Sequence, residues 1–170
     1  MVGGGARSFV YMVPQMSPGP RIELRRSKVT SLTADAIFAT LCDLRMTPTW
    51  LPNCTGLELV DEGPMAAGAR LRYSFREFGY AGTLPCTVTA FIPGQRIAIG
   101  FSDARFEASF DFLLDHRDGV TTITHHVELL PKSLAVRLVG GMLRRALPGR
   151  MEAALHGLDQ AASRAEQADA

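Results

Sequence analysis

Among the acidic, histidine and tyrosine residues of this 170-residue sequence, the clearest candidates for acid–base chemistry lie in stretches of alternating polarity. His125 alternates in step with Ile123 and Val127, so we expect it on the apolar face of a strand. There it would be either a general acid or base near neutral pH or a histidine packed in the core. Tyr73 and Glu77 share one face of an earlier strand, whose end would bring Glu77 either to a pocket or into solvent. His125, Tyr73 and Glu77 are thus the catalytic candidates if the protein is an enzyme, and otherwise no residue is assigned a catalytic role.

Cations and one large aromatic residue offer binding chemistry. The first predicted strand carries Arg25, Arg26 and Lys28. An inward arginine would anchor a carboxylate, phosphate or enolate oxygen, whereas outward charges would protect a sheet edge. Trp50, the single tryptophan, lies between two prolines. It would either cap a ligand or anchor a short helix to the core.

Motifs for cofactors and metals are absent from the sequence. There is no G-x-G-x-x-G, G-x-x-x-x-G-K-[ST], G-x-S-x-G or H-E-x-x-H. Adjacent His125 and His126 would point to opposite faces of a strand, which does not suit a shared metal. We therefore expect no cofactor and no metal site. Cys42, Cys54 and Cys86 form no C-x-x-C pair, which is typical of a reducing compartment and predicts a cytoplasmic protein.

The charge balance limits the partners. Eighteen basic and 17 acidic residues give a net charge of +1, which argues against a nucleic-acid binder. The segment Lys132–Arg150 nevertheless carries five cations and no acid. This pattern predicts either a transient contact with a membrane surface or a solvated outer helix face. The excess of arginine over lysine is typical of a GC-rich bacterial genome.

Hydrophobic periodicity predicts the elements that hold these groups. Residues 1–20 form a glycine- and proline-rich leader that we expect to be disordered, and 168–170 a short tail. Between them a single domain, 21–167, begins with a strand at 21–30 and one or two short helices near 34–42 and 46–51. Six strands joined largely by hairpins follow, so the sheet is antiparallel and the class is α+β. They are centred on 57–59, 70–76, 84–92, 97–101, 106–114 and 122–129.

A long helix is predicted over 132–167, with an interruption at Pro148-Gly149. Its apolar residues suggest two buried faces, and a straight helix could not bury both. We therefore expect a kink or break near Pro148. The first face holds Leu134, Leu138, Met142 and Ala146, and the second holds Met151, Leu155, Leu158 and Ala162.

The whole pattern resembles the START-like (SRPBCC) superfamily with its Bet v 1-type helix-grip fold, and within it the bacterial polyketide cyclase/dehydrase and lipid-transport group. The resemblance rests on residues 33–38, Leu41-Cys42-Asp43, residues 48–52, Gly68 before the strand at 70–78, the Pro93-Gly94 turn and the closing helix. It implies a curved sheet of about seven strands around the C-terminal helix, with an apolar ligand between them.

The resemblance also implies where the ligand would lie and what it would be. The cavity would hold a lipid, polyketide or aromatic compound, and the protein would act as a carrier or sensor. The alternatives are a polyketide aromatase/cyclase or dehydratase using the same cavity, and a regulatory domain that binds a protein partner. The expected cavity residues are Trp50, Tyr73, Phe75, Leu84, Phe101, Phe106, Phe110, Phe112, His125, Leu138 and Met142.

Overall fold

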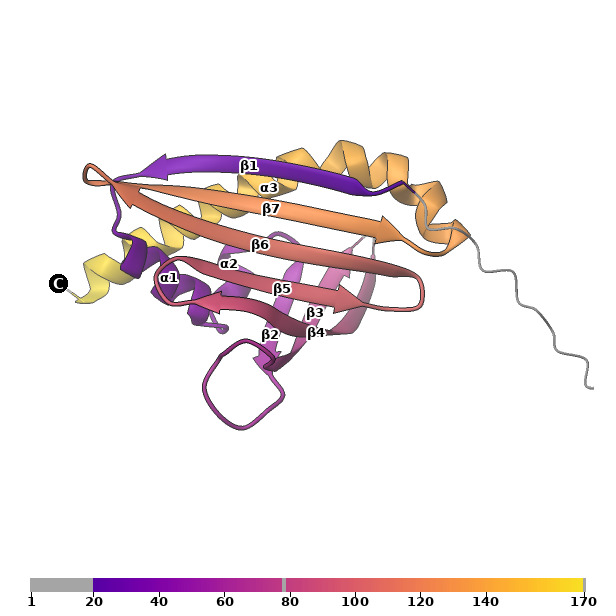
Figure 1. Cartoon of the computed structure of the whole chain (residues 1–170), viewed down its shortest axis with the longest axis horizontal. Coiled ribbons are helices and arrows are strands. Elements are labelled where there is room, and N and C mark those ends of the chain that lie inside the picture. Colours follow the sequence, from indigo (N-terminus) through magenta and orange to yellow (C-terminus); the bar gives the residue numbers. More distant parts are fainter. Residues whose placement is uncertain (1–19, 78, 170) are drawn as a thin grey trace, which may run out of the picture.

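The computed structural model describes residues 20–77 and 79–169 and shows one sheet gripping one long helix (Figure 1). The α+β helix-grip fold predicted from the sequence is confirmed. The elements are β1 (Ile22–Thr30), α1 (Ala34–Cys42), α2 (Thr47–Trp50), β2 (Cys54–Leu59), β3 (Arg70–Glu77), β4 (Tyr80–Ile92), β5 (Arg96–Ser102), β6 (Phe106–Arg117), β7 (Val120–Pro131) and α3 (Leu134–Asp169).

Hairpins determine the sheet topology. The seven strands lie in the order β1-β7-β6-β5-β4-β3-β2, and every neighbouring pair is antiparallel. At the β6–β7 turn, Asp118 and Gly119 both have positive φ, 52° and 78°. Two such residues suit the tight turn whose twist matches that of the flanking strands. β1 lies beside β7, so β1 and β2 are the two edge strands of this open sheet.

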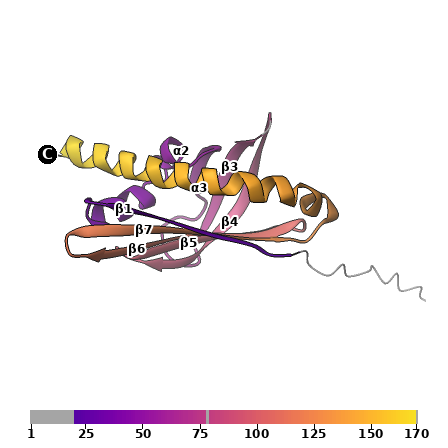
Figure 2. The ribbon, with the colours of Figure 1, turned by 90° about the horizontal axis from the view of Figure 1, so that it is seen from above.

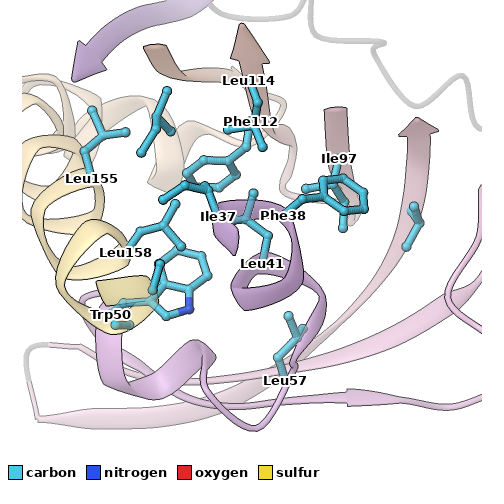
Figure 3. Packing of buried hydrophobic residues seen from close by; sticks show 14 of the residues in the cluster. Ile37, Phe38, Leu41, Trp50, Leu57, Ile97, Phe112, Leu114, Leu155 and Leu158 are labelled. Carbon is cyan, nitrogen blue, oxygen red and sulfur yellow. The ribbon is translucent and has the colours of Figure 1, made fainter. Parts of the chain in front are cut away.

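The main hydrophobic core lies where α1, α2 and the C-terminal half of α3 cover one end of the sheet (Figure 3). Thr33 caps α1 by accepting a hydrogen bond from the backbone N–H of Ala36 at 3.2 Å. Trp50 is 6% exposed and its ring meets that of Phe112 edge-on at 5.7 Å. Gly157 allows α3 to approach α2, since a Cβ there would lie 2.7 Å from the Trp50 carbonyl oxygen.

The long helix differs from its prediction. It is continuous from Leu134 to Asp169 with Pro148 inside it, although its axis bends along its length (Figure 1). The expected inward face of its first half is wrong: Leu134, Leu138 and Met142 are 59%, 76% and 56% exposed. The inward side chains form one stripe at spacings of three and four residues, so no break is needed to bury it. This stripe is Val136, Gly140, Leu143, Leu147, Met151, Ala154, Leu158 and Ala161.

The predicted leader, 1–20, lies outside the described residues apart from Pro20, while α3 extends to Asp169, into the segment predicted as a tail. Within 20–77 and 79–169, no helix has both the length and the apolar character needed to cross a membrane.

Candidate functional site

A cavity of about 300 Å³ lies between the sheet and the middle of α3, beside the main core. It is mostly apolar because side chains from the inward faces of β3 to β7 meet those of the helix stripe there. Figure 2 shows α3 lying along one face of the sheet. The strands provide Tyr73, Phe75, Glu77, Leu84, Phe101, Phe106, Ala108, Phe110, His125, Val127 and Leu129. The helix provides Val136, Leu143, Leu147, Arg150, Met151 and Ala154, and the loop after α2 provides Leu51, Pro52 and Asn53.

Four residues expected in the cavity lie elsewhere. Trp50 and Phe112 do face inward, but α1 and α2 cover that end of the sheet, so both are packed in the core. Leu138 and Met142 lie on the outer face of α3, opposite Leu143 and the rest of the inward stripe. The remaining expected residues come together around the cavity: Tyr73, Phe75, Leu84, Phe101, Phe106, Phe110 and His125.

His125 is the polar group buried deepest in the cavity wall. Its side chain stacks on Phe112, with ring centroids 4.1 Å apart and planes 12° from parallel, and the ring of Phe110, which also lines the cavity, lies perpendicular to it at 6.1 Å between centroids. The residue is 3% exposed, and neither ring nitrogen has a hydrogen-bond partner among the described residues. Burial, with a smaller repulsion from His126, lowers the pKa of His125 to about 4. The imidazole is therefore neutral near pH 7 and presents an unsatisfied donor and an unsatisfied acceptor.

A second polar group bridges the strands and the helix at the cavity wall. An Arg150 guanidinium nitrogen lies 2.5 Å from a Glu77 carboxylate oxygen, and both side chains are about one quarter exposed. Glu77 therefore lines the cavity instead of emerging into solvent. Burial is the main cause of a raised pKa at the Tyr73 phenol, and the nearby Arg150 charge opposes that rise.

Arg150 is a charged cavity residue that the sequence analysis named only as the end of the basic segment Lys132–Arg150. Its spacing could have indicated an inward position, because Arg150 follows Leu147 by three residues and precedes Ala154 by four, on the inward stripe of α3. A cation on an apolar helix face requires a partner, and here that partner is Glu77.

The cations of the first strand do not reach the cavity. Arg26 lies 3.4 Å from Glu152, and Lys28 lies 3.3 Å from Asp159. These ion pairs attach β1 to α3, so the basic groups of β1 hold the helix in place and do not contact the cavity. Arg25 points to the outer face of the sheet, where it is exposed.

On the outer face, Glu23, His126 and Glu128 place one ligand atom each within 4.8 Å of one another. Among the described residues this is the single grouping with metal-ligand spacing. Two contacts already satisfy it: His126 Nε2 lies 3.0 Å from the Glu23 carboxylate, and Glu128 accepts a hydrogen bond from Arg21. We assign no metal to it. A depression of about 810 Å³ on the same face is lined by threonine, serine, arginine and glutamate as well as apolar groups.

Similarity to a known protein family extends over most of the chain. The sequence model of the family described as polyketide cyclase/dehydrase and lipid transport matches residues 21–163. No curated protein sequence matches the chain.

Several solved structures share the fold. The Zhui aromatase/cyclase from Streptomyces sp. R1128 is 14% identical, with a TM-score of 0.72 over 85% of this chain and 95% of that one. A START superfamily protein from Mycobacterium smegmatis is 15% identical, with a TM-score of 0.68 over 84% and 97%. Norcoclaurine synthase from Thalictrum flavum is 13% identical, with a TM-score of 0.64 over 94% and 95%. At these identities the similarity shows a common fold.

Proposed function

The chain belongs to the polyketide cyclase/dehydrase and lipid-transport family, and on that premise we propose that it binds a lipophilic small molecule between its sheet and α3, as a carrier or sensor. The observation that supports this most is the apolar cavity of about 300 Å³, which the protein's own side chains leave unfilled. A pocket of that size and lining is the usual form of a small-molecule site.

The cavity wall indicates the shape of the ligand. Aromatic rings follow one another along it, from Phe110 to Phe101 at 5.1 Å between centroids, to Tyr73 at 5.5 Å and to Phe75 at 6.1 Å. Burying an apolar body against such a wall yields roughly 25 cal/mol per Å² removed from water. A lipid, polyketide or aromatic compound would fit this surface.

The ligand should also carry at least one hydrogen-bonding group. A buried polar atom without a partner costs about 1–3 kcal/mol, and both nitrogens of His125 are in that position. A ligand hydroxyl or carbonyl beside His125 would remove part of this cost.

The test is mass spectrometry of organic-solvent extracts from the purified protein. We expect an apolar molecule in the wild type and its loss from Phe110→Trp, which adds ring volume inside the cavity. Val29→Trp is the matched control, because Val29 is 61% exposed on β1, away from the cavity, and should keep the molecule. A lipid of the expression host would show an accessible cavity. If nothing is extracted and hydrophobic fluorescent probes also fail to bind, the carrier function is rejected.

An aromatase/cyclase or dehydratase is the second candidate, and the polar groups that converge on the cavity favour it. His125, Tyr73, Glu77 and Arg150 all line the cavity. Neutral His125 could accept a proton from a carbon between two carbonyls, and the Tyr73 hydroxyl or the Arg150 guanidinium could stabilise the enolate oxygen.

The enzymatic candidate has its own test, the exchange of α-protons of a small 1,3-diketone with deuterated water, followed by NMR. Catalysis predicts accelerated exchange that is lost in His125→Phe. A wild-type rate equal to that of His125→Phe would exclude His125 as the base and leave the binding function standing.

A regulatory domain that binds a protein partner receives less support, since that alternative requires an interior filled by side chains.

We also propose a reducing compartment, the cytoplasm, because Cys42, Cys54 and Cys86 are free thiols.

A further inference from the structure

The outer face of the first half of α3 carries an apolar stripe that no described residue covers. Leu134, Leu138 and Met142 follow one another at intervals of four residues, and they are 59%, 76% and 56% exposed. Side chains four apart lie one above the other on a helix, so these three form a continuous strip. It lies on the side of the helix opposite Val136 and Leu143, which face the cavity.

Positive charge accompanies this strip. Arg137, Arg144 and Arg145 are exposed on the same half of the helix, and no acidic residue occurs between positions 132 and 151. None of the three guanidinium groups forms an ion pair with a residue of the described ranges. Lys132, by contrast, is held by Glu107 at 2.6 Å. Helix turns with exposed leucine, methionine and unpaired arginine have the composition of a segment that lies in a membrane interface.

We propose that the outer face of residues 134–145 docks onto the surface of an anionic lipid membrane. Leu134, Leu138 and Met142 would enter the boundary between headgroups and acyl chains. The three arginines would contact lipid phosphates while their aliphatic stems lie along the apolar layer. The charges favour an anionic membrane over an uncharged apolar partner, because such a partner would leave three desolvated arginines without counter-charges.

Docking would also place the cavity next to the bilayer. Val136, Leu143 and Leu147, on the inner side of the same turns, form part of the cavity wall. A single helical layer would then separate the cavity from the lipid. The inference goes beyond the proposed function and does not depend on it, because the docking face and the cavity share no side chain among the residues named here.

The experiment is vesicle flotation of the full chain, with vesicles of phosphatidylcholine alone or mixed with phosphatidylglycerol. We expect binding to the anionic vesicles that weakens as salt is raised, since mobile ions screen exposed charges. Arg144→Gln with Arg145→Gln should lower the partition coefficient about fivefold for each arginine. Leu138→Ser with Met142→Ser should lower it by about tenfold or more, because the apolar anchors are lost.

Matched surface variants control for general effects of charge and polarity. Arg117→Gln and Val120→Ser change exposed residues at the β6–β7 turn and should bind vesicles like the wild type. All the variants should keep the wild-type melting temperature and the wild-type affinity for a soluble hydrophobic probe in the cavity. Lost vesicle binding with intact probe binding therefore concerns the docking face alone.

Three results would overturn the inference. The first is no flotation of the wild type with anionic vesicles, and the second is equal loss of binding in the control and docking variants. The third is a wild-type dimer in light scattering that becomes a monomer in Leu138→Ser with Met142→Ser, together with unchanged flotation of that variant. That pattern would make the face a contact between two copies of the chain.

Discussion

Neutral burial of His125 predicts a pH-dependent contribution of this residue to the stability of the protein. The pKa of His125 is lowered to about 4 in the folded protein, whereas an unfolded histidine titrates near 6.5. As the pH falls, the unfolded chain takes up the proton first, so the folded state loses stability between about pH 6.5 and pH 4. Above that window the contribution is fully present.

The magnitude follows from the two pKa values. A shift of one unit corresponds to 1.36 kcal/mol, so the whole window is worth about 3 kcal/mol. Between pH 7 and pH 4.5, His125 should lower the free energy of unfolding by about 2.5 kcal/mol. The pKa of Asp103 is held near 2 by hydrogen bonds from Arg105, so the loss that this carboxylate causes falls below the tested range.

Urea denaturation at pH 7 and pH 4.5 measures the effect. Trp50 provides the signal, since its ring packs on Phe112, which in turn stacks on His125. The wild type should lose about 2.5 kcal/mol more than His125→Phe between these two pH values. At pH 7 the variant should be as stable as the wild type or more so, because phenylalanine brings no unpaired nitrogen into the wall.

His156→Gln is the matched control, because His156 is exposed on α3 and should leave the wild-type pH dependence unchanged. Equal losses in the wild type and His125→Phe would refute the reasoning. His125 would then be protonated in the folded protein, or hydrated well enough to titrate normally.

Three further perturbations test the packing around the cavity. Gly157→Ala should lower the free energy of unfolding by about 1–3 kcal/mol, because the new methyl group would meet the α2 backbone. Gly149→Ala has open space around its Cβ and should raise the free energy of unfolding by as much as about 1 kcal/mol, since alanine favours a helix more than glycine does. Thermal unfolding measures both changes. Burial raises the pKa of the Cys86 thiol to about 12. A disulfide reagent at pH 8 should therefore label Cys86 only as fast as the protein opens. Rapid labelling of the native state would contradict this burial. Arg150→Gln should lower the free energy of unfolding, measured by urea denaturation, by about 1–3 kcal/mol, because it removes the ion-pair partner of Glu77. A double-mutant cycle with Glu77→Gln should show coupling between the two sites. Additive effects would argue against their ion pair.

Alternation along the strands predicted the inward residues of the sheet correctly. Tyr73, Phe101, Phe110 and His125 fall on the expected faces because neighbouring side chains of a strand point to opposite sides of the sheet. The same rule could not separate cavity from core. Phe112 has the parity of Phe110, yet α1 and α2 cover its end of the sheet. That difference depends on where the short helices pack, which no strand pattern contains.

The long helix shows a second limit of sequence patterns. Leu134, Leu138 and Met142 form a better apolar stripe by composition than the true inward set, which includes Gly140 and Arg150. Periodicity identifies an apolar face but not the surface against which it packs. The inward face is determined by the continuation of the stripe through Met151, Ala154 and Leu158 into the core, and Arg150 is tolerated there because β3 supplies Glu77.

The state of His125 also bears on the choice between carrier and enzyme. With a pKa near 4 the imidazole is neutral at pH 7 and is a weak base, so it can accept a hydrogen bond but holds a proton poorly. A carrier needs no more than this neutral form. An enzyme that uses His125 to take a proton from carbon needs the pKa of His125 to rise when substrate binds, for example through the negative charge of an enolate held between His125 and Arg150. An NMR titration of His125 with and without a bound 1,3-diketone therefore separates the two functions. A pKa that stays near 4 favours binding alone, and a rise toward 7 favours catalysis.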